Sequence, residues 1–287
     1  MKVVTILVTN DIIFPVFCKE KIKNGAEKMK VACIQMDIVF GDVEKNMENA
    51  KNKISEAMKE RPDVIVLPEL WTTGYDLTRL SEIADRDGLE TKERLKEWSK
   101  QYGVHIVGGS IAKQTEQGVT NTMYVVNNEG DLVNEYSKVH LFQLMDEHKY
   151  LMAGNKTGEF KLDDIECAGT ICYDIRFPEW MRVHTAKGAK VFFVVAEWPL
   201  VRLAHWRLLL QARAVENQCY VVACNRSGKD PNNEFAGHSL IVDPWGEVVV
   251  EANKEESILF GELTFEKIKE VRKGIPVFAD RRPELYK

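Results

Sequence analysis

The chain alternates short apolar runs with longer segments in which apolar residues recur every three or four positions. In the first half, residues 31–36, 64–67 and 104–111 are apolar runs of strand length. Between them, residues 43–60 and 89–102 place their apolar side chains on one helical face. Strands that alternate with helices in this way are typical of an α/β fold with buried sheets.

The second half repeats the alternation. Its predicted strands are 165–171, 191–195 and 220–223, with one helix after Pro178 and another over 202–216. Turn residues at 127–130 and 243–246 predict two hairpins, which join 122–126 to 132–136 and 239–242 to 247–251.

No Pro-rich or Gly/Ser-rich linker divides the chain. A regular first strand starts at Met29, so we expect a single domain over residues 29–287. Residues 1–28 are then an N-terminal extension of uncertain order.

The composition is that of an ordinary folded protein, with 45% hydrophobic and 29% charged residues among 287. The net charge is -5 and no dense basic run is present, so nucleic acid is not an expected partner. Apolar stretches such as 191–196 are far shorter than the roughly 20 residues that span a bilayer, so no membrane partner is expected.

Six cysteines do not form a disulfide framework in a chain of this length. Cys167 with Cys172, and Cys219 with Cys224, share one spacing, but residues five apart on a strand point to opposite faces. Neither pair can therefore bind one metal ion. We expect reduced thiols, a cytoplasmic location and neither a metal nor a cofactor.

Three reactive side chains directly follow apolar strands. Glu69 comes after the strand at 64–67, Lys138 after the strand that ends near residue 136, and Cys172 at the end of 165–171. Ligands bind at the carboxyl ends of strands in parallel α/β sheets. Each residue alone would be a solvated or packing residue, but a carboxylate, an ammonium and a thiol are chemically complementary. Together they predict a catalytic site.

The segments around these residues resemble a known family. Residues 67–71 (LPELW), 138–142 (KVHLF) and 171–179 (ICYDIRFPE) look like the three signature segments of the nitrilase superfamily of carbon–nitrogen hydrolases. The similarity extends from about Met29 to the C-terminus. It implies a four-layer αββα sandwich that is usually paired into a homodimer.

For the site, the resemblance implies a triad of Glu69, Lys138 and Cys172. A thiol with an ordinary pKa of about 8.5 is mostly protonated at neutral pH and needs a base. We expect Glu69 to take that proton, to pass it to the leaving nitrogen and later to activate water. Lys138 and the backbone N–H of Tyr173 are expected to stabilise the oxyanion.

The resemblance also implies a second acidic side chain beside the triad. Members of the family often carry a glutamate shortly after the lysine segment, where it positions the lysine or the substrate. Glu147 is the preferred candidate, ahead of Asp146. The alternative is a solvated acid in a loop.

Residues 196–199 (AEWP), 204–206 (AHW) and 211–218 (QARAVENQ) look most like the ω-amidase branch. Members of that branch remove the terminal amide of small dicarboxylic acid monoamides such as 2-oxoglutaramate. Glu197 departs from the asparagine that is frequent in close relatives. Its charge either disfavours an acidic substrate or pairs with an arginine.

Arg176 and Arg202 are the candidates to bind a substrate carboxylate, because a guanidinium donates two parallel hydrogen bonds to it. The alternatives are an ion pair of Arg176 with Glu179 or Asp174, and solvation of Arg202 at a helix start. Aromatic walls of the pocket are expected from Trp71, Tyr75, Tyr173 and Trp198.

The expected function is hydrolysis of the C–N bond of a small linear amide through a cysteine thioester, with release of ammonia. A nitrilase or an N-carbamoyl amidohydrolase would use the same triad, and a non-catalytic interaction protein is the third alternative. Cys224 is the best competing nucleophile. The expected partners are a small-molecule amide and a second copy of the chain.

Overall fold

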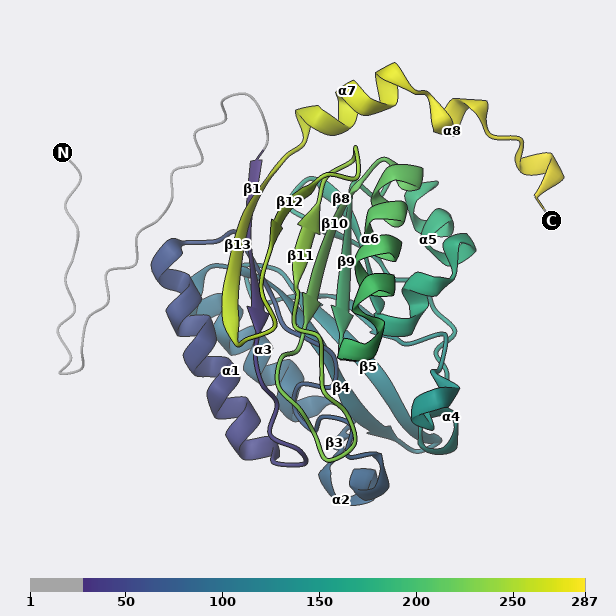
Figure 1. Ribbon diagram of the computed structural model, residues 1–287. Helices are drawn as coiled ribbons and strands as arrows, with labels where there is room; N and C mark the ends of the chain where they lie inside the picture. The colour runs from purple at the N-terminus through teal and green to yellow at the C-terminus, as the bar shows by residue number, and fades with distance from the viewer. Residues whose placement is uncertain (1–27, 287) are drawn as a thin grey trace, which may run out of the picture.

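The computed structural model describes residues 28–286 as two sheets packed face to face, with helices on both outer faces (Figure 1). Helices α1 and α3 cover one sheet, and α5 and α6 cover the other. The predicted four-layer αββα sandwich is therefore confirmed. The predicted N-terminal extension, residues 1–28, lies outside the described residues except for Lys28, which begins β1.

The first sheet has the strand order β13-β1-β2-β4-β5-β6, and β3 pairs with β4. Strands β1, β2 and β4 are parallel, whereas β13 lies antiparallel beside β1. The strands are β1 (Lys28–Gln35), β2 (Val64–Val66), β3 (Asp85–Arg86), β4 (His105–Thr115), β5 (Gly118–Val126), β6 (Leu132–Ser137) and β13 (Ser257–Thr264).

The second sheet has the order β12-β11-β10-β9-β8-β7. Its central strands β8, β9 and β10 are parallel, so their carboxyl ends meet at one edge of the sheet. The strands are β7 (Glu159–Leu162), β8 (Ile165–Ile171), β9 (Val191–Ala196), β10 (Tyr220–Asn225), β11 (Leu240–Val242) and β12 (Val248–Glu251).

Local signals fix the ends of the main helices. The Asp42 side chain accepts a hydrogen bond from the Lys45 N–H at the start of α1, and Gly103 ends α3 with a left-handed φ of 61°. The α-helices are α1 (Val43–Ala57), α2 (Leu80–Ile83), α3 (Leu89–Tyr102), α4 (Glu147–Tyr150), α5 (Pro178–Thr185), α6 (Leu203–Asn217), α7 (Glu266–Gly274) and α8 (Val277–Asp280).

Short 3₁₀ turns complete the chain, and none of the helices between residues 28 and 286 is long and apolar enough to cross a membrane. The 3₁₀ turns are η1 (Met58–Glu60), η2 (Leu77–Arg79), η3 (Gln143–Met145), η4 (Cys172–Arg176), η5 (Leu200–Arg202) and η6 (Pro283–Leu285).

Strand β1 shows how the layers are built. Its side chains alternate, so Val31 and Cys33 belong to the core between the sheets, while Ala32 and Ile34 belong to the core beneath α1 and α3. A strand buried on both faces reads as a continuous apolar run, which is the pattern that predicted it.

The predicted elements are largely confirmed, and the structure adds elements that were not predicted, namely β3, β7, β13, α2, α4, α7 and α8. The helix expected over 43–60 ends at Ala57 and continues as the 3₁₀ turn η1. Strand β13 was not predicted, because only Leu259 and Leu263 of its eight residues are buried and Gly261 interrupts the pattern. Both predicted hairpins form, as β5–β6 and β11–β12.

Candidate active site

The two sheets bring the predicted reactive residues to one place. Glu69 follows β2 of the first sheet, Lys138 follows β6, and Cys172 follows β8 of the second sheet. All three are buried, Glu69 and Lys138 completely and Cys172 with 5% exposure. The site therefore depends on how the sheets are stacked, as well as on each segment.

The Glu69 carboxylate accepts four hydrogen bonds. Its Oε1 accepts from Lys138 Nζ at 2.8 Å, from Asn121 Nδ2 at 2.8 Å and from the Tyr75 hydroxyl at 3.3 Å. Its Oε2 accepts from the backbone N–H of Glu197 at 2.8 Å. Donors on both oxygens hold the carboxylate in a fixed orientation.

Glu147 is a second carboxylate on the same ammonium. Its Oε1 accepts from Lys138 Nζ at 2.6 Å and from the Tyr75 hydroxyl at 2.6 Å, and its Oε2 accepts from the Phe142 N–H at 2.8 Å. Burial raises the pKa of Glu147 against the opposing effect of Lys138. Glu147 is wholly buried, so it is not a solvated loop acid, whereas Asp146 is exposed.

Lys138 is a buried cation between these two carboxylates. Burial acts against its charge, but the carboxylates of Glu147 and Glu69 outweigh this effect and hold its pKa well above the ordinary value. An ammonium that stays charged can stabilise negative charge as it develops on a bound carbonyl oxygen.

Cys172 occupies a strained turn at the end of β8. Its φ is 44°, in the left-handed region that residues other than glycine rarely adopt and that recurs at functional sites. Burial raises the pKa of the thiol well above its ordinary value, as do Glu69 and Glu147, against the opposing Lys138 ammonium. This direction favours the thiol over the thiolate, so attack on a substrate calls for a base.

Asp174 ties the cysteine turn to the lysine segment. Its Oδ2 accepts from the Ile171 N–H at 3.1 Å and from the Tyr136 hydroxyl at 2.7 Å. Its Oδ1 lies 2.7 Å from His140 Nδ1 and accepts from the His140 N–H at 3.0 Å. These contacts fix Cys172 relative to the segment that carries Lys138.

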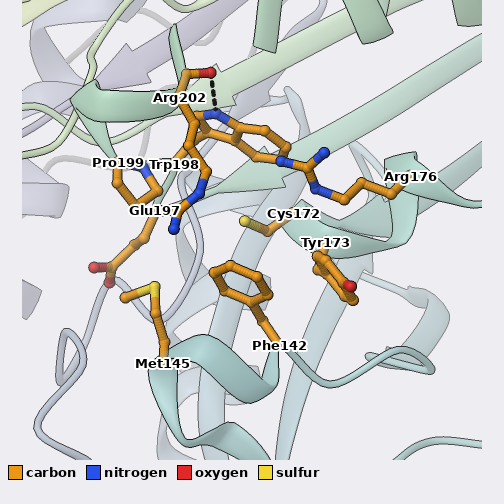
Figure 2. Close-up of a pocket in the computed structure, with 9 residues that line it drawn as sticks. All are labelled: Phe142, Met145, Cys172, Tyr173, Arg176, Glu197, Trp198, Pro199 and Arg202. Carbon is orange, nitrogen blue, oxygen red and sulfur yellow. Dashed lines mark hydrogen bonds between the residues drawn. The ribbon is translucent and has the colours of Figure 1, made fainter. Parts of the chain in front are cut away.

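A small pocket opens onto Cys172 (Figure 2). Its small size suits a ligand of few atoms. The five residues predicted for binding all line it. The lining is Phe142, Met145, Cys172, Tyr173, Arg176, Glu197, Trp198, Pro199 and Arg202.

The two arginines frame this cavity through aromatic contacts. The Arg176 guanidinium lies over the Trp198 ring at 4.8 Å, and that of Arg202 lies over the Phe142 ring at 5.5 Å. Among the described residues, neither arginine forms an ion pair with a carboxylate. The alternative ion pair of Arg176 with Glu179 or Asp174 is therefore absent from this part of the chain.

Glu197 pairs with an arginine, which was one of its two predicted alternatives. Its Oε2 accepts from Arg226 Nη1 at 2.9 Å, and both side chains are wholly buried. Burial raises the pKa of Glu197 to about 8, while Arg226 opposes the rise and Glu69 adds to it.

Two of the predicted aromatic walls have other roles. Trp71 lies in the core against Trp98, and its Nε1 donates to the Gly108 carbonyl at 2.8 Å, so its assignment to the pocket is wrong. Tyr75 contributes its hydroxyl to Glu69 and Glu147. The tight loop beyond Glu69 imposes this arrangement, which composition and spacing do not reveal.

Sequence reasoning missed Asn121 and Arg226, which bond directly to Glu69 and Glu197. A polar residue inside an apolar strand was the available signal for Asn121. Cys224, the competing nucleophile, is wholly buried between the sheets, where its thiol donates to the carbonyls of Ile34 and Val66 at 3.4 Å.

Comparisons with known proteins show the family of the chain. The family model "Carbon-nitrogen hydrolase" matches residues 30–273. A 2-oxoglutaramate amidase of Bacillus subtilis is 54% identical over 90% of this chain and 100% of its own, and human Omega-amidase NIT2 is 32% identical over 90% and 96%. The crystal structure of Saccharomyces cerevisiae Nit3, a member of the nitrilase superfamily, has a TM-score of 0.83 at 30% identity and covers 89% of this chain and 97% of its own. The chain belongs to the carbon–nitrogen hydrolase family of the nitrilase superfamily.

Proposed function

We propose that the protein is an ω-amidase, which hydrolyses the terminal amide of a small dicarboxylic acid monoamide such as 2-oxoglutaramate and releases ammonia. The observation that carries the proposal is the Lys138 ammonium held 2.8 Å from Glu69 and 2.6 Å from Glu147, beside a cavity that contains the Cys172 thiol. Thiol, base and cation are the groups that acyl transfer from an amide requires.

Acylation begins with transfer of the Cys172 proton to Glu69. The sulfur attacks the amide carbon, and the carbonyl oxygen becomes an oxyanion that Lys138 and the backbone N–H of Tyr173 stabilise. Glu69 then gives the proton to the nitrogen, the C–N bond breaks and ammonia leaves. The acyl group remains on Cys172 as a thioester.

Deacylation reuses the same base. Glu69 takes a proton from a water molecule, and the hydroxyl oxygen attacks the thioester carbon. The C–S bond breaks, the sulfur regains the proton and the carboxylic acid product leaves. Glu147 accepts hydrogen bonds from Lys138 and Tyr75 throughout, which keeps the ammonium directed at the reacting oxygen.

The two arginines support an acidic substrate. Arg176 and Arg202 both line the cavity with no carboxylate partner among the described residues, and a substrate carboxylate would supply one. Glu197 is paired with Arg226, and burial raises its pKa to about 8; both effects reduce negative charge beside the pocket, which answers the main objection to an anionic substrate. Trp198 and Tyr173 form the walls beside the carbon chain.

An ammonia-release panel tests the proposal. We expect 2-oxoglutaramate and succinamate to be hydrolysed far faster than butyramide, butyronitrile or an N-carbamoyl amino acid. Mass spectrometry of the quenched enzyme should find an acyl adduct on Cys172, and Cys172→Ala should release no ammonia. A nitrile or a carbamoyl compound that is preferred by orders of magnitude would overturn the substrate assignment, and no turnover of any compound would favour a binding role.

The remaining expectations belong to the same proposal. We propose a single hydrolase domain over residues 29–287, a cytoplasmic location that suits free buried thiols, and a homodimer. Four apolar side chains on or next to α6 are exposed, and exposed apolar side chains that lie together often mark a contact with another chain. They support the homodimer. They are Val201, Leu208, Val215 and Trp245. Light scattering of the purified chain tests the dimer.

A further inference from the structure

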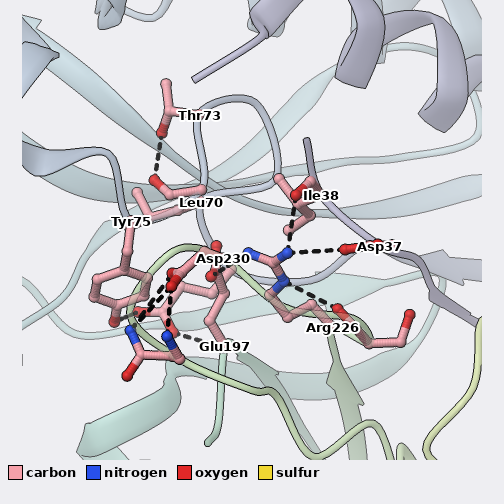
Figure 3. Close-up of polar contacts among 12 residues, drawn as sticks. Asp37, Ile38, Leu70, Thr73, Tyr75, Glu197, Arg226 and Asp230 are labelled. Atoms are coloured by element: carbon pink, nitrogen blue, oxygen red, sulfur yellow. Dashed lines mark hydrogen bonds and ion pairs between the residues drawn. The ribbon is translucent and has the colours of Figure 1, made fainter. Parts of the chain in front are cut away.

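Arg226 joins the two sheets immediately behind the candidate site (Figure 3). Its Nη1 donates to Glu197 Oε2 at 2.9 Å, at the end of β9 in the second sheet. Its Nη2 donates to Asp37 Oδ1 at 3.0 Å and to the Ile38 carbonyl at 2.8 Å, in the loop that follows β1 of the first sheet. One guanidinium therefore holds a strand end of each sheet.

The guanidinium itself is held firmly. It is wholly buried, it lies over the Phe235 ring at 4.1 Å, and its Nε donates to the Ser227 carbonyl at 3.1 Å. The backbone N–H of Arg226 donates to the Ala196 carbonyl at 3.0 Å, directly before Glu197. A planar group with donors on both sides is rigid in a way that a lysine is not.

Glu197 transmits this anchoring to Glu69. Its backbone N–H donates to Glu69 Oε2 at 2.8 Å, whereas Lys138, Asn121 and Tyr75 all bond to Oε1. Glu197 is thus the described residue that orients the second oxygen of the base. Its side chain is fixed by Arg226, so the backbone N–H cannot rotate away without breaking that contact.

We propose that Arg226 and Glu197 are positioning residues that set the Glu69 carboxylate against the Cys172 thiol across the two sheets. Glu69 comes from the first sheet and Cys172 from the second, so a small shift of one sheet on the other separates them. The Arg226 bridge opposes that shift. The inference rests on the proposed function, in which Glu69 removes the thiol proton.

The charges around the pair fit this role. Glu197 faces Glu69, Tyr75, Asp230 and Arg226, and its second oxygen has no hydrogen-bond partner among the described residues. Burial raises its pKa to about 8. A buried acid that is costly to ionise, and has one oxygen without a hydrogen bond, lowers the stability of the fold. Stability therefore does not explain this residue, whereas a role in the site does.

Arg226→Lys and Arg226→Met test the inference, with Arg207→Met as the matched control. Arg207 forms an arginine–glutamate contact of 2.7 Å with Glu251 on the outer side of the second sheet, away from the site. Lysine keeps the charge at 226 but replaces the planar fork, which reaches Glu197 through Nη1 and Asp37 through Nη2, with one compact ammonium. Folded fractions are checked by denaturant unfolding before each assay.

Two readouts separate positioning from stability. The first is the kcat and KM of ammonia release: we expect kcat to fall up to about 100-fold in both Arg226 variants, because a misplacement of about 1 Å can cost that much, with KM changed less than about threefold. The second is the pH dependence of Cys172 alkylation by iodoacetamide, followed by peptide mass spectrometry. The pH dependence of alkylation should change when Glu69 no longer faces the thiol, because Glu69 both accepts the thiol proton and raises the thiol pKa. Arg207→Met should match the wild type in both readouts.

The outcomes are distinct. Folded Arg226 variants with wild-type kcat and a wild-type alkylation profile would overturn the positioning role while leaving the amidase in place. If the wild-type protein releases no ammonia from any amide, the proposed function is overturned. In that case, a pH dependence of Cys172 alkylation that differs between the wild type and the Arg226 variants would still support the positioning role. Glu197→Gln, which retains the backbone N–H and an acceptor for Arg226, should keep more kcat than Arg226→Met, and a larger loss would also contradict the inference.

Discussion

Lys138 Nζ lies 2.6 Å from Glu147 Oε1, and both side chains are wholly buried, Lys138 just after β6 and Glu147 at the start of α4. The ammonium is also shared with Glu69, so one buried cation faces two carboxylates. Charges buried together in this way are strongly coupled, and removing one of them leaves the others uncompensated.

Lys138→Met should therefore affect both activity and stability. We expect kcat to fall by at least about 100-fold, because an oxyanion donor is lost, and the free energy of unfolding to fall by about 3–5 kcal/mol, because two carboxylates lose their cation. Ammonia release and urea unfolding measure the two effects. The double variant Lys138→Met with Glu69→Gln should unfold less readily than the single variant, and an equal or greater loss would contradict the coupling.

Arg176→Met should separate acidic from neutral substrates. Loss of a charged hydrogen bond to a substrate carboxylate is expected to raise KM for succinamate about tenfold or more, while KM for butyramide stays within about twofold. The same comparison on Arg202→Met shows whether one guanidinium or both bind the carboxylate. Equal changes for both substrates would mean that the arginine shapes the cavity only through its stacking on Trp198.

The stability of the protein should fall with rising pH through the titration of Glu197. Its pKa is about 8 in the folded chain against an ordinary value of 4.5. Below the ordinary value both folded and unfolded chains hold the proton, and this contribution is fully present. As the pH rises, the unfolded chain loses the proton first, so the contribution is lost progressively until the pH passes the folded pKa.

Glu197→Gln isolates that contribution. Between pH 5 and pH 8.5, the unfolding free energy of the wild type should fall by up to about 4 kcal/mol relative to that of the variant. At higher pH the difference should level off. Chemical denaturation at a series of pH values measures it. A difference that does not change with pH would mean that Glu197 titrates at its ordinary pKa in the folded protein.

Gly109→Ala should disturb the loop that carries Glu69. A methyl group there would lie 2.1 Å from the Pro68 carbonyl oxygen, at a φ of 59°. Gly103→Ala is the matched control, because its φ is 61° but no atom lies within 4 Å of the added carbon. Both variants should lose about 1 kcal/mol of stability from the backbone conformation, and only Gly109→Ala should lose more and also lose activity. Equal losses would exclude the close contact as the cause.

Local patterns were sufficient to predict most of the fold. Strand β9, which is buried on both faces, is a continuous apolar run, and α3 has both its helical period and a terminal glycine. Strand β13 was not predicted, because it lies at the edge of its sheet and buries few of its residues. Its place beside β1 follows from long-range pairing that no local pattern encodes.

The order of residues along the chain was sufficient to predict the chemistry of the site. Glu69, Lys138 and Cys172 stand at strand ends, and strand ends can be read from apolar runs that stop at polar residues. Their segments also carry the family resemblance, which supplied Glu147 and the four-layer arrangement.

How these groups are held and charged depends instead on the packing of the folded chain. Tyr75, Asn121 and Arg226 reach the site from three other segments, and Glu197 and Glu69 meet across 128 positions of the chain. A hydrogen bond between such distant residues depends on how two sheets stack, and burial, which sets the pKa of each group, depends on everything packed around it. The spacing of residues along the chain therefore predicts neither these long-range hydrogen bonds nor the burial of each group.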